Sequence, residues 1–433
     1  MLWDEQNTLE RFETSCLDRL NMAGALLGAT GWIDHLARLV AIDTAPSSGE
    51  GYPAFTEVLQ DLFAPLGFAL RSVEVPRGGQ TGETAAEMQP NLIASRFTGR
   101  PVCSILCHMD TAPAGEGWTR PPLALTRQGS QLFGRGTVDM KGAIIALWAA
   151  LRVADAVGLP LRFDPLLVFT ARDREGDFPG LRHFAEQGLL EGHALCLNGS
   201  AVPRVWAGCL GQFDLEIRVQ RSAVRAGARA AALAMRRILA ELGELQGELV
   251  QRGSELPASP ERGGGRVHPS LSILSVGAAA EQDGPQPLCR LLVRRRFSAG
   301  EGFQSALEEL GARIARGSAA GSPGGCSVEF RVLRRLDPVA EPDQGPNWPA
   351  WQRALGWGFG FAPENFRRWG GADGAVLSLV QQAGLREILL GGLLRPGQRR
   401  HGPDEHTTVE DVEALARSVL AYLAEVPEMP DPC

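Results

Sequence analysis

Hydrophobic residues recur along the first part of the chain with two alternating spacings, one typical of amphipathic helices and one typical of short buried strands. Helices are predicted at residues 1–28, 32–42, 54–63 and 142–156. Strands are predicted at residues 68–75, 91–97, 102–107 and 165–170. Strands that alternate with helices indicate an α/β domain, in which functional side chains usually lie at the carboxyl ends of the strands.

The middle of the chain follows a different order of elements. Strands are predicted at residues 213–219, 270–275, 290–297 and 326–333, and helices at residues 223–245 and 301–316. The resulting order, βαββαβ, is that of a ferredoxin-like domain. The α/β pattern resumes after residue 351, so we interpret the βαββαβ segment as an insertion into a larger domain. We expect three parts: a helical extension at 1–28, an α/β domain at 29–212 and 342–425, and the inserted domain at 213–341.

Composition and charge exclude several classes of protein. The 433 residues are 44% hydrophobic, which is enough to build the cores of two or three domains. The formal net charge of -7 argues against binding to nucleic acid or to an anionic membrane, because both require concentrated positive charge. The chain has no signal-peptide pattern, no apolar run of the ~18 residues that span a membrane, and no paired cysteine spacing. We therefore expect a cytoplasmic globular protein.

One basic residue differs from all the others. The chain has 43 lysines and arginines, and Lys141 is the only lysine among them. Lysine is a compact ammonium on a flexible stem, whereas arginine is a wide planar fork, so a position that keeps lysine in such an arginine-rich chain is expected to be tightly packed.

Three segments carry residues suited to bind a metal ion. His108 and Asp110 come at the end of a predicted buried strand, Asp139 comes just before a predicted helix, and His401 lies in a polar loop near the C-terminus. Imidazole and carboxylate groups at neighbouring strand ends are ligands of zinc and related divalent ions. A further carboxylate such as Asp110 would fix the tautomer of the ligating imidazole.

The order of these motifs resembles the M20 family of metal-dependent amidohydrolases, which includes aminoacylases, acetylornithine and succinyl-diaminopimelate deacylases, carboxypeptidase G-like enzymes and dipeptidases. The resemblance runs from about residue 32 to residue 423. It is carried by the strings CHMDTAPAGEGW (107–118), FGRGTVDMKG (133–142), WGGADGAVL (369–377) and RHGPDEHTTVEDV (400–412).

The resemblance implies a mixed-sheet α/β catalytic domain with an inserted βαββαβ lid that often serves for homodimerisation. It also implies two zinc ions bridged by one aspartate, with a water activated by a glutamate. Transferred by position, Asp139 would be the bridge, His108 and His401 would each bind one metal ion, and Asp110 would orient His108. The expected cofactor is zinc or cobalt, and the expected substrate is a small N-acyl amino acid or dipeptide.

The chain departs from the family pattern at two places that normally carry carboxylates. An adjacent glutamate pair, base and then ligand, is expected where this chain has Asp173, Arg174 and Glu175. Depending on the register, either Asp173 is the base and Arg174 replaces the ligand, or Arg174 replaces the base and Glu175 is the ligand. A later carboxylate ligand on the His108 side corresponds to Asn198, whose neutral oxygen is a weaker ligand for zinc.

The inserted domain carries one further candidate. Arg296 matches a lid arginine that often binds a substrate carboxylate in the family, because a guanidinium pairs with a carboxylate through two hydrogen bonds. The lid histidine of the family has no counterpart between residues 220 and 225.

Two functions remain open at this point. The first is an amidohydrolase with an altered site, in which His108, Asp139 and His401 hold one ion and Asp173 or Glu175 acts as the base. The second is a catalytically impaired or repurposed protein for small-molecule binding or acyl chemistry, in which the Arg174 guanidinium stands where a metal stood. Whether the site holds two ions, one or none is left open by the residues.

Overall fold

The computed structural model describes residues 5–46, 51–76, 88–171, 178–221, 228–260, 263–278, 289–319, 326–372 and 374–425. The chain forms two compact units. The first unit comprises residues 1–205, 343–367 and 379–433, and the second comprises residues 206–342 and 368–378.

The first unit is built on a six-stranded mixed sheet with the strand order β1-β2-β6-β3-β7-β15. Its strands are β1 (Ala69–Pro76), β2 (Met88–Ser95), β3 (Val102–His108), β6 (Asp164–Thr170), β7 (His193–Cys196) and β15 (Ile388–Leu390). β6, β3, β7 and β15 run parallel, whereas β2 is antiparallel to both β1 and β6. Every residue of β6 is buried, which is why it reads as a continuous apolar run in the sequence.

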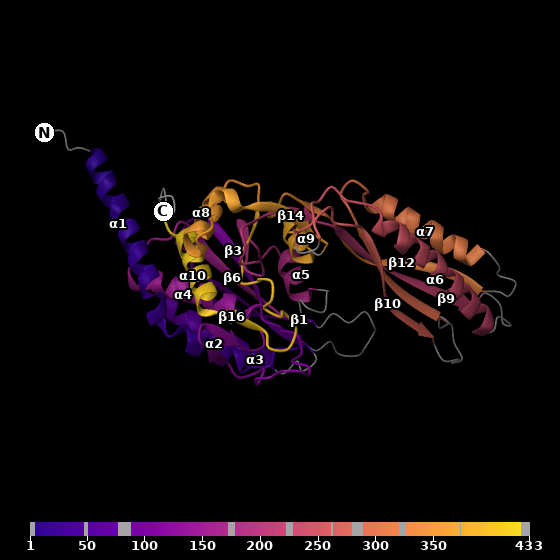
Figure 1. Ribbon diagram of the computed structural model, residues 1–433, viewed down its shortest axis with the longest axis horizontal. Helices are drawn as coiled ribbons and strands as arrows, with labels where there is room; N and C mark the ends of the chain where they lie inside the picture. The colour runs from indigo at the N-terminus through magenta and orange to yellow at the C-terminus, as the bar shows by residue number, and fades with distance from the viewer. Residues whose placement is uncertain are drawn as a thin grey trace. The chain divides into compact units, whose positions relative to one another are not determined.

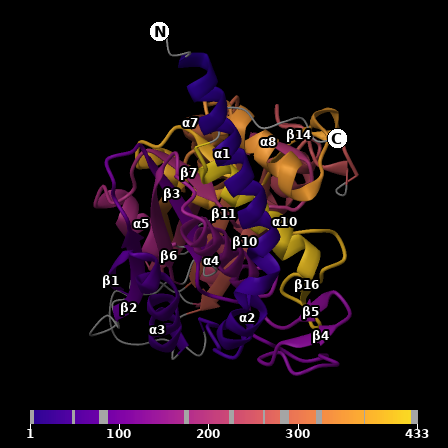
Figure 2. The same ribbon diagram turned by 90° about the vertical axis from the view of Figure 1, so that its left-hand side faces the viewer.

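The first unit contains the following helices, and all of them except α5 and α9 contribute residues to the main hydrophobic core. They are α1 (Glu5–Leu26), α2 (Trp32–Val40), α3 (Gly51–Phe63), α4 (Lys141–Ala156), α5 (Pro179–Glu186), α8 (Trp348–Phe359), α9 (Ala375–Gln382), which begins in the second unit, and α10 (Val409–Leu423). α4 packs against α10, and α1 runs past both of them (Figure 2). Nearly every residue of α4 is buried, so the helix that follows Asp139 is anchored on all sides.

The described residues also form two three-stranded sheets. One has the order β16-β5-β4 and consists of β4 (Thr126–Gln128), β5 (Gln131–Phe133) and β16 (His406–Thr408). The other has the order β13-β8-β14 and consists of β8 (Arg204–Cys209), β13 (Val339–Ala340) and β14 (Arg367–Gly371). The sheet β16-β5-β4 places residues near 130 beside residues near 407. These two segments are close in sequence to Asp139 and His401, respectively.

The second unit has the predicted order βαββαβ. Its elements are β9 (Gly211–Arg221), α6 (Ala228–Val250), β10 (Ser270–Ala278), β11 (Cys289–Phe297), α7 (Phe303–Ala319) and β12 (Cys326–Leu336). The four strands form an antiparallel sheet with the order β10-β11-β9-β12. α6 and α7 lie side by side on one face of it and enclose a separate core (Figure 1).

The other face of this sheet is polar and densely paired. Asp214 and Glu216 are both buried on β9. Asp214 accepts hydrogen bonds from Arg294 Nε (2.8 Å) and Arg334 Nη2 (2.6 Å), and Glu216 accepts one from Arg331 Nε (2.7 Å). Alternation of apolar and charged residues along β9 therefore reflects one face packed on helices and one face covered by ion pairs.

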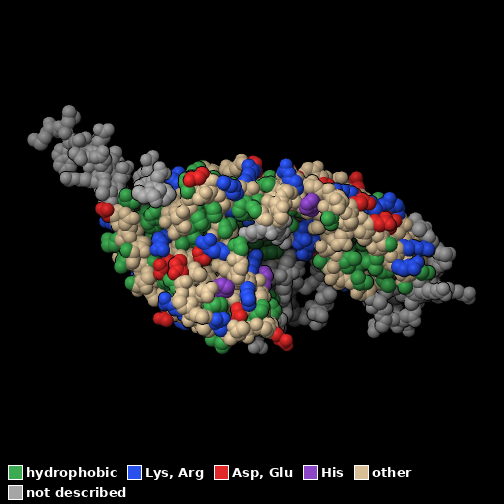
Figure 3. Space-filling model, in the orientation of Figure 1, with side chains coloured by type: hydrophobic (Ala, Val, Ile, Leu, Met, Phe, Trp, Pro, Cys, Tyr) green, Lys and Arg blue, Asp and Glu red, His purple; other side chains and the backbone are tan. Residues whose placement is uncertain are grey.

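The edge strand β10 exposes large hydrophobic side chains, namely those of Ile273, Leu274 and Val276. Hydrophobic side chains are also visible on the face of the second unit shown in Figure 3. Among the described residues, no helix has the length and apolar character needed to cross a membrane.

The fold class predicted from the sequence is confirmed, and the predicted long helices and strands occur within a few residues of the expected bounds. No bounds were predicted from the sequence for the helices α5, α8, α9 and α10, nor for eight strands of two to six residues, namely β4, β5, β7, β8, β13, β14, β15 and β16. Most of these strands are too short to show a periodicity.

Candidate functional site

The candidate site is assembled by three segments of the first unit. His108 ends β3, at the carboxyl edge of the parallel strands. Asp139 lies just before α4, which starts at Lys141. His401 lies in the loop between β15 and β16. This position agrees with the rule that ligands bind beyond the carboxyl ends of parallel strands.

The buried carboxylate of Asp139 is the centre of the site. His108 Nε2 lies 3.0 Å from Asp139 Oδ1, and His401 Nε2 lies 2.7 Å from Asp139 Oδ2. Arg400 Nε donates a second hydrogen bond to Oδ2 at 2.8 Å. The structure thus brings together the three predicted metal-binding residues, with one imidazole on each oxygen of one carboxylate.

These contacts keep Asp139 ionised. Burial alone would raise the pKa of the carboxyl group, but the neighbouring His108, the hydrogen bond to His401 and the charge of Arg400 hold this pKa well below its ordinary value. Asp139 therefore provides a full negative charge in a place that excludes most solvent.

Both ring nitrogens of His108 face acceptors. Nδ1 lies 2.9 Å from the backbone oxygen of Asp110, which requires a proton on Nδ1. Nε2 then faces the ionised Asp139 Oδ1 at 3.0 Å. A lone pair and a carboxylate oxygen repel at this distance unless a cation, either a proton or a metal ion, lies between them.

Asp110 orients His108 in a way that differs from the prediction. We expected its carboxylate to hold the imidazole, but His108 Nδ1 lies 2.9 Å from the backbone oxygen of Asp110 and 3.7 Å from its carboxylate oxygen Oδ1. The tautomer that results is the same, with the proton on Nδ1 and Nε2 directed at Asp139.

A buried ion pair connects the two loops of the site. Arg135 Nη1 donates to Glu405 Oε2 at 2.6 Å, and Arg135 Nη2 donates to the backbone oxygen of His401 at 3.2 Å. Glu405 Oε1 accepts backbone N–H groups, including those of Gly136 (3.1 Å) and Asp139 (3.3 Å). The pair therefore fixes the backbones of Asp139 and His401 relative to each other.

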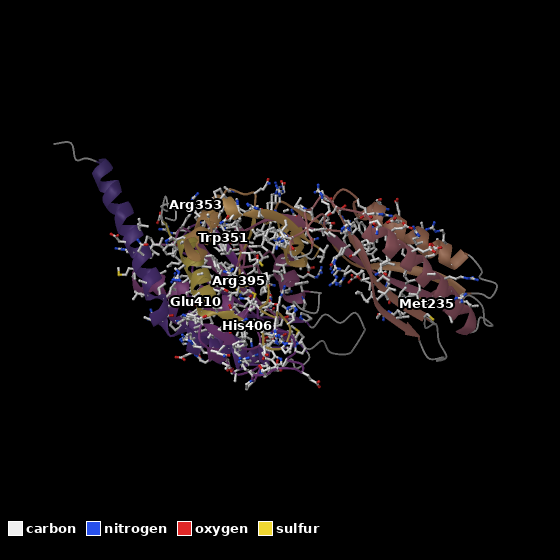
Figure 4. All side chains as sticks on the ribbon, in the orientation of Figure 1. Met235, Trp351, Arg353, Arg395, His406 and Glu410 are labelled. Atoms are coloured by element: carbon white, nitrogen blue, oxygen red, sulfur yellow. The ribbon has the colours of Figure 1, made fainter. Side chains whose placement is uncertain are left out.

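An ion pair holds the start of the loop that carries His401 against α10. Arg395 Nε donates a hydrogen bond to Asp411 Oδ1 at 2.9 Å. Figure 4 labels Arg395 together with His406 and Glu410. His401 itself has a φ of 66°, in the left-handed region that residues other than glycine rarely adopt. Such a conformation persists only where its surroundings enforce it, as the hydrogen bond from Arg135 does here.

Lys141 is packed as its rarity in the sequence predicts. Its side chain is 1% exposed, and Nζ donates to the backbone oxygen of Ile42 at 2.7 Å. A Cβ atom on Gly136 would lie only 2.9 Å from Lys141 Cδ, so the aliphatic part of the Lys141 side chain packs directly against the backbone of Gly136. Burial lowers the pKa of Lys141 to about 7, although the charges of Asp43 and Glu405 act in the opposite direction.

The remaining predicted residues are Asp173, Arg174, Glu175, Asn198 and Arg296. Asp173, Arg174 and Glu175 lie outside the described residues. Asn198 follows β7, the neighbour of β3, and its Oδ1 atom is buried without a hydrogen-bond partner. Arg296 lies on β11 in the second unit.

The described residues supply some of the ligands that a divalent ion requires, but not a complete set. Each oxygen of Asp139 is paired with one imidazole, whereas zinc takes three or four protein ligands. Within the described ranges, no three His, Cys, Asp or Glu side chains surround a common point. His108 Nε2 and Asp139 Oδ1 face each other at 3.0 Å, and Asn198 Oδ1 is a buried oxygen beyond the end of β7 without a hydrogen-bond partner among the described residues.

Three residues that shape the site were not singled out from the sequence, namely Arg135, Arg400 and Glu405. All three lie inside the strings that resemble the family, so the sequence did mark these segments as candidates. Their roles depend on contacts between segments that are far apart in the chain, and spacing along the sequence does not reveal such contacts.

Comparison with known proteins gives a family match over most of the chain and a shorter match to a curated relative. The family model described as peptidase family M20/M25/M40 matches residues 105–425. A segment of 176 residues is 34% identical to the succinyl-diaminopimelate desuccinylase of Rhodospirillum rubrum and covers 38% of this chain and 43% of that protein. The match thus spans less than half the length of this curated relative.

Solved structures share the fold over almost the whole chain. The dipeptidase Dug1p of Saccharomyces cerevisiae has a TM-score of 0.70 at 15% identity, covering 96% of this chain and 99% of that chain. YxeP of Bacillus subtilis, described as a dinuclear metal-binding peptidase, has a TM-score of 0.54 at 14% identity, covering 95% of this chain and 97% of that chain. At these identities the likeness concerns the fold alone.

Proposed function

Since the chain belongs to peptidase family M20/M25/M40, we propose that it is a metal-dependent amidohydrolase that cleaves the amide bond of a small N-acyl amino acid or dipeptide. The observation that carries the proposal is the placement of His108 and His401 on the two oxygens of the buried Asp139. A buried, ionised carboxylate between two imidazoles is a ligand set for divalent cations.

Each residue of the cluster has a part in this proposal. His108, Asp139 and His401 bind the metal, which is zinc or cobalt. A divalent ion bound there supplies Lewis-acid polarisation of the scissile carbonyl and lowers the pKa of water. Arg135 and Glu405 hold the two ligand loops together, and the Asp110 backbone oxygen fixes the tautomer of His108.

Two further roles stay predictions. The base that takes the proton from water is assigned to Asp173 or Glu175, the carboxylates nearest the expected position in the sequence. Arg296 is assigned to binding of a substrate carboxylate, which suits N-acyl amino acids and dipeptides because both carry one. The name of the Rhodospirillum relative, a desuccinylase, supports an acyl amino acid as substrate.

A second candidate function is a repurposed binding protein on the same fold. It is favoured by Arg174 and Asn198, which stand where carboxylates are expected, and by the contact of Arg400 with Asp139. A site with less negative charge and an added arginine binds cations less tightly.

Homodimerisation through the second unit is also proposed. β10 is one of the two edge strands of the described sheet, and its exposed Ile273, Leu274 and Val276 provide apolar area beside the backbone edge of that sheet.

The experiment that tests the function is a hydrolysis assay on metal-free protein to which zinc or cobalt is restored. The panel contains N-acetyl and N-succinyl amino acids and dipeptides. We expect turnover that depends on added metal and is lost in Asp139→Asn, while His268→Ala, a change at an exposed histidine of the second unit, leaves it intact. Absence of turnover on the whole panel with either metal would favour the binding protein.

A further inference from the structure

Three arginines converge on one buried carboxylate in the second unit. The side chain of Glu216 on β9 has no exposed surface. Its Oε2 atom accepts hydrogen bonds from Arg218 Nε at 2.9 Å and from Arg331 Nε at 2.7 Å, and its Oε1 atom forms an ion pair with Arg290. The arginines come from the neighbouring strands β9, β12 and β11, on the face of the sheet opposite α6 and α7 (Figure 1). The three guanidinium groups are therefore close neighbours, because each lies beside the same carboxylate.

The positive charge of this cluster exceeds its negative charge. Burial raises the pKa of the Glu216 carboxyl group, but the hydrogen bonds from Arg331 and Arg218 outweigh this effect. The charge of Arg290 adds to them, so the pKa of Glu216 lies below its ordinary value and the carboxylate is ionised. Among the described residues, Glu216 is the only acidic partner that forms an ion pair with these arginines. One negative charge thus faces three permanent positive charges.

The strand register adds to the repulsion within the cluster. Arg218 stands directly opposite Arg290 in the β9–β11 pair, and like charges at directly opposed positions destabilise an antiparallel sheet. On the other side of β9, Arg218 stands opposite Glu329, whose carboxylate accepts a hydrogen bond from Gln220 Nε2 at 3.4 Å. Glu329 offsets part of the surplus charge. An anion bound over the guanidinium groups would remove the rest of the repulsion.

The arginines of the cluster remain accessible to a ligand. The side chains of Arg331, Arg290 and Arg218 are 56%, 40% and 33% exposed. A guanidinium group has five N–H donors, and Glu216 occupies only a few of those in the cluster. Guanidinium groups that surround one point on three sides suit an anion with at least three oxygens and two charges, which describes a phosphate group better than a carboxylate.

We propose that Arg218, Arg290 and Arg331 form a binding site for a phosphate group, either inorganic phosphate or the phosphate of a small ester. The cluster belongs to the second unit, whereas Asp139 belongs to the first. Arg296, the candidate for binding a substrate carboxylate, is six residues from Arg290 along β11, which is about 20 Å in an extended strand. Nucleic acid is a poor match, because the whole chain has a net charge of -7. The site therefore goes beyond the proposed hydrolysis and does not depend on it.

The test is isothermal titration of the full-length protein with inorganic phosphate, with glycerol 3-phosphate and with succinate. At pH 8 a phosphate group carries about two negative charges, as succinate does on two separate carboxylates. Sodium chloride at about 0.15 M screens long-range attraction. At least one of the two phosphates should bind more tightly than succinate, and the tighter one identifies the source of the phosphate group. No binding of either phosphate, or an affinity for succinate that equals or exceeds theirs, would overturn the proposal.

Two substitutions locate the site. Arg290→Gln and Arg331→Gln each remove one positive charge and should weaken phosphate binding at least about tenfold, the effect of losing one hydrogen bond between charged groups. Arg335→Gln is the matched control and should change the affinity less than about twofold. Arg335 lies on the same strand as Arg331, is 48% exposed, and forms its ion pair with Asp337. Equal losses in Arg331→Gln and Arg335→Gln, or unchanged binding in both cluster variants, would contradict the site.

A third substitution gives a result that misfolding cannot produce. Glu329→Gln removes the negative charge opposite Arg218 and keeps the size of the side chain, so phosphate binding should become stronger. Unchanged or weaker binding in Glu329→Gln, with circular dichroism like that of the wild type, would show that the surplus charge of the cluster does not bind the anion.

Discussion

Arg135 and Glu405 form an ion pair of 2.6 Å although 270 residues separate them along the chain. Each is only 1% exposed. Because Arg135 also bonds the backbone of His401 and Glu405 also bonds the backbone of Asp139, this pair sets the distance between two of the proposed metal ligands.

Breaking this pair should destabilise the protein strongly. Arg135→Ala leaves the Glu405 carboxylate buried without its guanidinium, and loss of one partner of a buried ion pair costs about 3–5 kcal/mol. The free energy of unfolding, measured in urea on metal-free protein, should fall by that amount. The control Arg399→Ala, at an exposed arginine of the same loop, should stay within about 0.5 kcal/mol of the wild type. A loss under about 1 kcal/mol for Arg135→Ala would show that the pair does not hold the loops.

The single lysine offers a direct probe of the packing next to Asp139. A lysine-specific protease has one site in this chain, after Lys141, which is buried at the start of α4. The folded protein should therefore resist this protease and be cut once, into two fragments, after unfolding. An arginine-specific protease, with exposed sites available, serves as the positive control. Cleavage after Lys141 in the folded protein at a comparable rate would contradict the buried position.

A buried histidine far from the site should make stability depend on pH. His193 Nε2 lies 2.5 Å from the hydroxyl oxygen of Tyr422, and burial, helped by the charge of Arg162, lowers the pKa of His193 to about 4. Since the unfolded chain has the ordinary pKa of about 6.5, it binds more protons between pH 6.5 and 4. The free energy of unfolding should therefore fall as the pH drops through this window, by up to roughly 3 kcal/mol.

The measurement is urea unfolding at several pH values for wild type and His193→Gln. Carboxylates also titrate at the acid end, so the contribution of His193 is the difference between the two curves from pH 6.5 to 5. Between pH 6.5 and 5, the free energy of unfolding of His193→Gln should not show the fall with decreasing pH that His193 causes in the wild type. Parallel curves would mean that His193 is already charged or exposed in the folded state.

The edge strand β10 should provide the dimer contact. Val276 on β10 and Val250 at the end of α6 have nearly equal exposed fractions, 56% and 58%. Val276→Lys should turn a dimer into a monomer, because a charge on an edge strand opposes pairing with a second strand, and Val250→Lys should have no effect. Light scattering after size exclusion gives the mass directly. A wild-type monomer, or dissociation by Val250→Lys alone, would contradict an interface on β10.

Much of the architecture follows from the sequence, because long helices and buried strands leave periodic patterns. The βαββαβ order of the second unit and the buried β6 are examples. The convergence of His108, Asp139 and His401 was predicted through the resemblance, since strand ends and ordered motifs are visible in one dimension. The contact between Arg400 and Asp139 was not predicted, because it depends on how a loop with left-handed residues folds back over the start of α4.

The role of Asp110 shows a second limit of the sequence. The residue type predicts a carboxylate that holds His108, yet the hydrogen bond is made by the backbone oxygen of the same residue. A sequence specifies which residue is adjacent, but the choice between its backbone and its side chain depends on rotamers and on local turn geometry.

The central claim is that His108 and Asp139 are two ligands of one divalent cation, and anomalous X-ray scattering tests it most directly. Crystals of zinc-loaded protein, measured on both sides of the zinc absorption edge, should show an anomalous peak within about 2.0–2.2 Å of His108 Nε2 and of an Asp139 oxygen. A map without a peak at Asp139, from crystals in which the two side chains are well ordered and zinc is in excess, would contradict it.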